Sequence, residues 1–308
     1  MSETSDETTS SNELVRQGER TVDNLKRLFA VVFALSFGIV GNGVFGKLKA
    51  ALLPPGYVAP TWLWILNIEM LVVFLVTAAV FYHQSVKFLD IRYARQPLSE
   101  AHPWGFAADY LQLVITVAPF FLMANSLGPE VTHKVGYLWF FGSYVLLLIF
   151  GLILLILSEA RHSQFVRVRI WGEKIAPEEV ERENSLRAYW MAMNSAVLLI
   201  LLISFWWASR SGSCPARGQA GAPPLFLFLF GIVALLRDYL DFRFAWPFLY
   251  PMSQASAERL LKWPMTSMKT ATTLKRWMLL GFAIVAADVG MLYVLRLWDF
   301  QFWISVCG

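Results

Sequence analysis

The stretch GYLWFFGSYVLLLIFGLILLIL occupies residues 136–157 and contains no charged side chain. A helix crosses the hydrocarbon core of a bilayer with about 20 predominantly apolar residues, so this stretch is long enough to span a membrane. The composition of the whole chain agrees, because 57% of its 308 residues are hydrophobic and only 16% are charged. A soluble domain carries about 25% charged residues. The sequence therefore predicts an integral membrane protein.

Similar apolar stretches recur along the chain and predict an all-α, polytopic transmembrane bundle of about seven helices. The predicted spans are residues 27–49, 62–84, 104–127, 136–159, 188–208, 223–247 and 277–297. The sixth span is cleanly apolar only from Leu225 to Leu236. We expect residues 25–300 to form one transmembrane domain and residues 301–308 to form an outer tail. Residues 1–24 are polar, acidic and rich in Ser and Thr, which predicts a disordered cytoplasmic tail.

The distribution of basic residues predicts the orientation of these spans. Twenty of the 26 Lys and Arg residues lie before or at the start of the first predicted span, or at and after the ends of the even-numbered spans. Basic residues accumulate on the cytoplasmic side of a membrane protein. We therefore expect a cytoplasmic amino terminus, an outside carboxyl terminus and a multi-pass location in the plasma (inner) membrane. Membrane lipid is the expected partner of the basic loops, and the positive charge does not require nucleic acid.

The first predicted span carries small residues at every fourth position. This stripe consists of Ala30, Ala34, Gly38, Asn42 and Gly46, which share one face of a helix. Small residues allow the backbones of two membrane helices to approach closely. The stripe therefore predicts either close helix packing without a further role, or a face that lines a pore or an interface between copies in a homo-oligomer.

Three polar residues inside predicted spans lie at a similar depth in the outer half of the membrane. They are Asn42, Glu69 and Asp288. An ionisable side chain in hydrocarbon is costly unless it is paired or hydrated, which makes such residues candidates for function. The trio predicts a path or site for a small cation or a proton. Alternatively, each carboxyl group is protonated or bonded to a neighbouring helix.

A second group of polar residues lies toward the cytoplasmic ends of the predicted spans. It contains His83, Asp109, Asn194, Arg237 and Asp241. Arg237 and Asp241 are one helical turn apart and can form an ion pair within their own helix. The group predicts either an inner vestibule or a self-neutralised helix end whose long side chains reach the headgroups. The second interpretation is favoured by the pattern.

Motifs for metals, cofactors and catalysis are not found. The four histidines lack metal-ligand spacing, and no hydrolase, zinc-protease, phosphate-binding or dinucleotide-binding signature occurs. The sequence thus predicts no cofactor and no metal, and leans against an enzyme. Its two cysteines, Cys214 and Cys307, are both expected outside the cell, where they either form a disulfide or remain unpaired thiols.

Three stretches resemble, in order, the lysosomal and bacterial potassium channels that are built from six-helix repeats. The stretch VFALSF at residues 32–37 resembles the pore-lining first helix of that family. Phe81-Tyr82-His83, followed by Phe88, resembles the end of its second helix, and the segment from Asp109 to Phe120 resembles its third helix.

This resemblance implies a cation channel in which Leu35 stands at the apolar constriction and His83 at the position of the histidine of the second helix. The chain departs from the family in two respects. Ala30 stands where the family's Phe-Ser-Asp signature has its aspartate, and a seventh helix disagrees with the family's even number of helices.

Three classes of function follow from these patterns. The leading hypothesis is a channel-like or transport protein that passes or senses a small cation or a proton. The second is a membrane scaffold or signalling subunit whose basic cytoplasmic loops, such as the one from Arg161 to Arg187, bind a partner or lipid. The third is a membrane-embedded enzyme that acts on lipid, with His83 and Asp109 in a shared cleft.

Overall fold

The computed structural model describes residues 3–52, 61–93, 103–127, 133–162, 177–211 and 225–250, together with five isolated positions between residues 283 and 293. The six ranges form an all-helical structure without a β-strand among them. The helices are α1 (Glu3–Leu52), α2 (Thr61–Tyr93), α3 (Pro103–Ser126), α4 (His133–His162), α5 (Pro177–Ser211) and α6 (Leu225–Leu249).

Prolines mark most helix starts. Pro103 and Pro177 are the first residues of α3 and α5, and Pro60 and Pro224 directly precede α2 and α6. Proline lacks an amide hydrogen and therefore fits the first turn of a helix, where that hydrogen would have no partner within the helix. At the other end of α1, the helix stops two residues before Pro54, because the residue before a proline avoids helical geometry.

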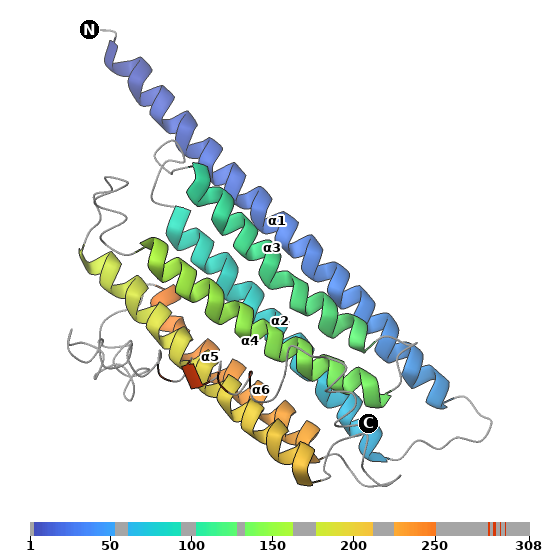
Figure 1. Ribbon diagram of the computed structural model, residues 1–308. Coiled ribbons are helices and arrows are strands. Elements are labelled where there is room, and N and C mark those ends of the chain that lie inside the picture. The colour runs from blue at the N-terminus through green and yellow to red at the C-terminus, as the bar shows by residue number, and fades with distance from the viewer. Residues whose placement is uncertain are drawn as a thin grey trace.

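α1 begins much earlier than the first predicted span. It starts at Glu3, so the helix includes nearly all of the segment 1–24 for which the sequence predicts a disordered tail. No proline interrupts residues 3–52, and the acidic residues Glu3, Asp6 and Glu7 lie where they interact favourably with the helix dipole. Figure 1 shows this part of α1, drawn in blue, projecting beyond the other helices.

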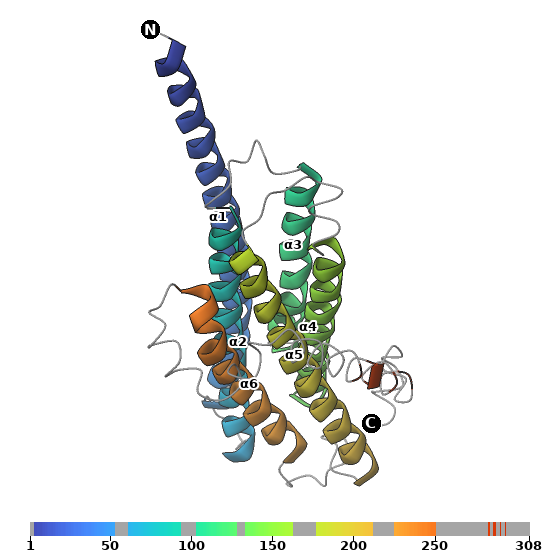
Figure 2. The same ribbon diagram turned by 90° about the vertical axis from the view of Figure 1, so that its left-hand side faces the viewer.

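The six helices lie side by side, and successive helices run in opposite directions (Figures 1 and 2). α1, α2 and α3 contact one another, α4 packs against α3 and α5, and α6 packs against α2 and α5. α2 is consequently shared between two groups of helices. One of its faces contacts α1 and α3, and another contacts α6.

Four of the helices contain stretches that are long and apolar enough to cross a membrane. These are Val22–Gly46, Ile65–Lys87, Gly136–Ile156 and Tyr189–Ala208, which correspond to the first, second, fourth and fifth predicted spans. The described part of α3 contributes a shorter apolar stretch, Val114–Ser126. α6 is present as a helix, but charged residues interrupt its apolar sequence.

The seventh predicted span, residues 277–297, lies outside the described ranges except for isolated positions. A bundle of seven helices and the orientation of the two termini stay predictions. The apolar spans of the described helices fit an integral membrane protein.

The interior and the outer surface of the bundle are both apolar. Many of the largest fully buried side chains are aromatic, among them Phe74, Phe120 and Tyr144. The outer surface exposes large aliphatic side chains such as Ile68 and Ile232. Lipid tails accommodate such a surface without the cost that water would impose. Buried polar side chains therefore stand out as exceptions in this fold.

Candidate functional site

The strongest concentration of buried polar groups surrounds Arg237 in the middle of α6. Arg237 is 8% exposed, and the carboxylates of Asp238 and Asp241 are almost completely buried. The guanidinium group contacts both of them, with Nη1 lying 2.6 Å from Asp238 Oδ1 and Nη2 lying 3.1 Å from Asp241 Oδ2. We call these three residues the Arg237 cluster.

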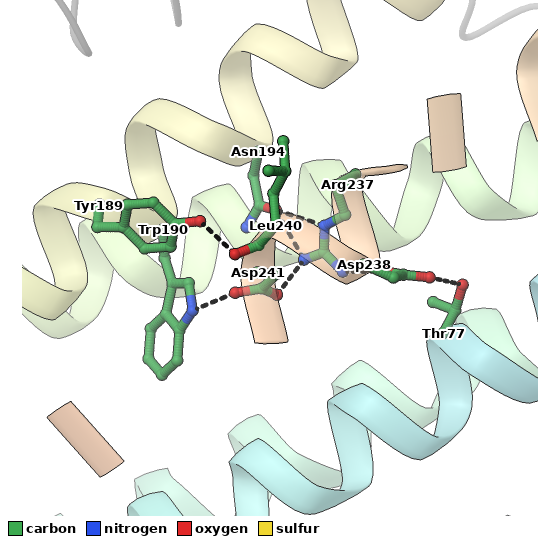
Figure 3. Close-up of polar contacts among 8 residues, drawn as sticks. All are labelled: Thr77, Tyr189, Trp190, Asn194, Arg237, Asp238, Leu240 and Asp241. Carbon is green, nitrogen blue, oxygen red and sulfur yellow. Dashed lines mark hydrogen bonds and ion pairs between the residues drawn. The ribbon is translucent and has the colours of Figure 1, made fainter. Parts of the chain in front are cut away.

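Neighbouring helices supply hydrogen bonds to every member of the Arg237 cluster, as Figure 3 shows. From α5, Asn194 Oδ1 accepts hydrogen bonds from Arg237 Nε at 3.3 Å and Nη2 at 2.8 Å. From α2, Thr77 Oγ1 donates to Asp238 Oδ2 at 2.5 Å. The indole Nε1 of Trp190, also on α5, donates to Asp241 Oδ1 at 2.8 Å.

The hydrogen bonds of Figure 3 tie three helices together at one level of the bundle. Asp238 is directed toward α2, and Asp241 is directed toward Trp190 on α5. Tyr189 adds a further link, since its hydroxyl donates to the backbone oxygen of Leu240 at 3.1 Å. Charged groups are buried in proteins when they are paired and hydrogen-bonded, which is the arrangement found here.

The formal charges of the Arg237 cluster do not cancel when both of its carboxyl groups are ionised. An arginine side chain is always protonated in proteins, so two ionised carboxylates beside one guanidinium group leave one negative charge in excess. A net charge in a membrane interior costs several kcal/mol unless something neutralises it. A bound proton or a small cation would supply the missing positive charge.

Tyr144 of α4 is a further buried polar residue near the Arg237 cluster. Its side chain is fully buried, and its hydroxyl has no hydrogen-bond partner among the described residues. The hydroxyl lies within electrostatic range of Arg237, Asp238 and Asp241. A buried hydroxyl without a partner costs about 1–3 kcal/mol, which a hydrogen-bonding ligand or a water molecule would recover.

The structure describes three members of the second group of polar residues at one place in the bundle, namely Asn194, Arg237 and Asp241. The ion pair between Arg237 and Asp241 is confirmed. The favoured interpretation, a helix end whose long side chains reach the headgroups, does not describe Arg237, because its guanidinium group is directed into the bundle and is held there by Asn194 and two carboxylates. Asn194 and Asp241 are thus brought together with Arg237, as a shared site requires.

His83 belongs to a different contact between α2 and α6. Its Nε2 atom lies 2.6 Å from the hydroxyl of Tyr250. Its ring is nearly parallel to the rings of Trp246 and Tyr250, and Lys87 lies 5.1 Å above the Tyr250 ring. Asp109 is part of α3, but its side chain lies outside the described ones, so a cleft shared by His83 and Asp109 stays a prediction.

Two members of the predicted trio, Asn42 and Glu69, lie in the part of the chain that the structure describes. Asn42 is exposed on α1. Glu69 instead lies against α6, where a Cβ atom added to Gly231 would come 2.6 Å from Glu69 Cδ. Asp288 lies outside the described residues. A common ion path through all three therefore stays a prediction, although Glu69 is placed beside the same helix as the Arg237 cluster.

The small-residue stripe of α1 faces outward. Ala34, Gly38 and Gly46 are exposed and Ala30 is partly buried. No atom would lie within 4 Å of a Cβ atom added to Gly38. The stripe is thus not used for close packing between described helices of the chain, and its role in a pore or homo-oligomer stays a prediction. The neighbouring Phe29 and Phe33 are buried instead.

The metal and disulfide predictions concern residues that lie partly outside the described ranges. No group of three or more His, Cys, Asp or Glu side chains within the six described ranges has the arrangement of a metal site. Cys214 and Cys307 both lie outside the described residues.

Sequence reasoning missed two hydrogen-bond partners of the Arg237 cluster, Thr77 and Trp190, and the nearby buried Tyr144. Thr77 and Tyr144 each contribute one hydroxyl group to a long apolar stretch. Trp190 resembles the tryptophans that lie at membrane interfaces. Thr77 is separated from Asp238 by 161 positions. Only the polar character of Thr77 within a span could have signalled its role.

Comparison with known proteins provides no relative. The chain matches no protein-family model, no curated protein and no solved structure. The resemblance to potassium channels consequently stays a prediction, and the function must be argued from the buried polar groups.

Proposed function

We propose that this integral membrane protein binds a small cation or a proton at the Arg237 cluster and passes or senses it. The observation that carries this proposal is the burial of one guanidinium group between two carboxyl groups in the bundle interior, which leaves one negative charge in excess when both carboxyl groups are ionised. The Tyr144 hydroxyl, which has no hydrogen-bond partner among the described residues, supports the proposal. Its oxygen can accept a hydrogen bond from a protonated group or coordinate a cation.

The surroundings of the Arg237 cluster favour reversible binding of a proton or cation over permanent binding. Asp238 and Asp241 each receive one hydrogen bond from a neighbouring helix in addition to their contact with Arg237. A proton or cation that binds to either carboxylate competes with Arg237 for it. Binding is therefore coupled to the contacts that hold α2, α5 and α6 together, which is what a transport or sensing step requires.

Ion flux into liposomes tests the proposal. Purified wild-type protein and the Asp238→Asn variant are reconstituted at equal density, and internal dyes report protons and potassium ions. We expect a flux in the wild type that Asp238→Asn abolishes, because asparagine retains the hydrogen-bonding shape but removes the excess negative charge. Asp23→Asn is the matched control, since Asp23 is exposed and pairs with Lys26 on α1.

The control variant should retain the wild-type flux. Size-exclusion chromatography verifies that both variants are folded before reconstitution. A wild-type flux no greater than that of empty liposomes, or an Asp238→Asn flux equal to the wild-type flux, would contradict passage of the ion through the Arg237 cluster.

A further inference from the structure

Glu69 is a second acidic group at the contact between α2 and α6. Its side chain lies against Gly231, where a Cβ atom would come 2.6 Å from Glu69 Cδ and 2.8 Å from Cγ. Only a glycine leaves space for the carboxyl group at this position. The second carboxyl oxygen of Glu69, Oε2, is buried.

The carboxyl group of Glu69 has no described partner that would stabilise a negative charge. Oε2 is buried without a hydrogen bond to any residue of the described ranges. The guanidinium group of Arg237 is committed to Asp238, Asp241 and Asn194. An ionised carboxylate in this apolar setting is costly, whereas the protonated acid is tolerated.

Glu69 also lies at the border between the bundle interior and its apolar outer surface. Its neighbours on α2 include Ile65, Ile68 and Val72, which are exposed by 54%, 56% and 38%. Ile232, adjacent to Gly231 on α6, is exposed by 58%. A small apolar molecule dissolved in lipid can therefore approach the carboxyl group from the membrane.

Glu69 and the Arg237 cluster occupy the same helix pair. Eight residues separate Glu69 from Thr77 on α2, and seven separate Gly231 from Asp238 on α6. At about 1.5 Å per residue, the two acidic positions are separated by roughly 10–12 Å along the helices.

We propose that Glu69 holds an exchangeable proton at the lipid-facing border of the α2 and α6 contact. This deepens the proposed function and rests on it, since Glu69 then serves as a proton-holding group above or below the Arg237 cluster. In the exchange, the O–H bond of the carboxylic acid breaks, the proton moves to a water molecule, and the electron pair remains on the carboxylate. The reverse step restores the acid.

A lipid-soluble carbodiimide tests the proposal, because it adds to a protonated carboxyl group within a membrane. Addition of the O–H group across one C=N bond yields an O-acylisourea, which rearranges to a stable N-acylurea without a leaving group. Peptide mass spectrometry of the reconstituted full chain then shows a gain of one reagent molecule at the modified residue.

The two reagents should label Glu69 and Asp23 with opposite preferences. Glu69 should be labelled severalfold more than the exposed Asp23 by the lipid-soluble reagent, and less than Asp23 by a water-soluble carbodiimide used with an amine. Labelling of Glu69 should decrease as the pH is raised and should disappear in Glu69→Gln, while Asp23→Asn leaves it unchanged.

Labelling of Glu69 by the lipid-soluble reagent at or below the level of Asp23 overturns the inference. The labelling experiment does not depend on ion flux, so its result is independent of the flux assay that tests the proposed function. Selective labelling of Glu69 in a protein without flux supports the proton-holding role and contradicts transport. Flux that depends on Asp238 without selective labelling of Glu69 retains the proposed function and removes this inference.

Discussion

The two faces of α2 show opposite ways of holding membrane helices together. Toward α1 and α3, aromatic rings fill the contact, and Phe120 of α3 lies within 4.9–6.4 Å of the ring centres of Phe33, Phe74 and Phe81. Toward α6, the same helix presents Glu69 and Thr77 to Gly231 and Asp238. The first face is held by packing of rings, whereas the second adds buried polar contacts to the ring packing of His83 against Trp246 and Tyr250.

The difference matters because lipid tails are as apolar as the side chains of the helices. Helix association in a membrane consequently depends on close packing and on polar contacts, with little help from the hydrophobic effect. Packing of rings tolerates exchange for another apolar side chain of similar size. The Arg237 cluster does not tolerate the loss of its guanidinium group, since the two carboxylates would be left buried without a positive partner.

The largest expected effect is on the polar face. Arg237→Gln removes the positive charge between two buried carboxylates and should lower the free energy of unfolding by about 3–5 kcal/mol. Thermal denaturation in detergent, followed by size-exclusion chromatography, measures the loss. Arg243→Gln is the control on the same helix, because Arg243 is exposed and its described hydrogen bond is to Tyr239. Equal losses in both variants would show that burial of the cluster is unimportant.

Loss of one hydrogen bond to the Arg237 cluster should have an intermediate effect. Thr77→Val retains the shape of the side chain but removes the donor to Asp238, and we expect a loss of about 2 kcal/mol. Thr77→Ser restores the hydroxyl and should recover most of that stability. If Thr77→Val is as stable as Thr77→Ser, the link between α2 and α6 does not depend on this hydrogen bond.

The contact of Glu69 with Gly231 gives a further test of the polar face. Gly231→Ala places a methyl group against the Glu69 carboxyl group and should cost about 1–2 kcal/mol, since the side chain must move. Combining Gly231→Ala with Glu69→Ala removes the overlap and should restore part of the stability. A double-mutant cycle measures the coupling, and strictly additive effects would contradict the observed contact.

The aromatic face should show the smallest effect. Phe120→Leu replaces a fully buried ring with another apolar side chain and should cost about 1 kcal/mol, because neighbouring rings can adjust to similar volumes. The same denaturation assay provides the number. A loss as large as that of Arg237→Gln would remove the distinction between the two faces of α2.

Local features of the fold could be predicted from the sequence. Long apolar stretches identified the spans in α1, α2, α4 and α5, and Pro103 and Pro177 stand at helix starts, where their missing amide hydrogen is not needed. The beginning of α1 at Glu3 was not predicted. The composition of a segment indicates how much apolar surface the segment can bury, but not whether the segment extends a helix that follows it.

The candidate site was predictable only where its contacts are local. Arg237 and Asp241 are one turn apart, so their ion pair follows from helical spacing. The side-chain contacts of Thr77 and Trp190 with the Arg237 cluster depend on which helices become neighbours in the bundle. Helical periodicity identifies a face of a helix but not its partner, and for the same reason it did not show that Glu69 lies against Gly231.

Stability as a function of cation concentration tests most directly whether the Arg237 cluster binds a positive charge. A ligand that binds the folded state raises its stability with concentration, by about 1.4 kcal/mol for each tenfold increase above the dissociation constant. The midpoint of thermal unfolding is measured in rising potassium, rising sodium or falling pH, with total ionic strength kept constant by a large organic cation. We predict that the wild-type midpoint rises with at least one of these ions and that the Asp238→Asn midpoint does not. A wild-type midpoint that follows none of them, or an identical rise in Asp238→Asn, would contradict the account.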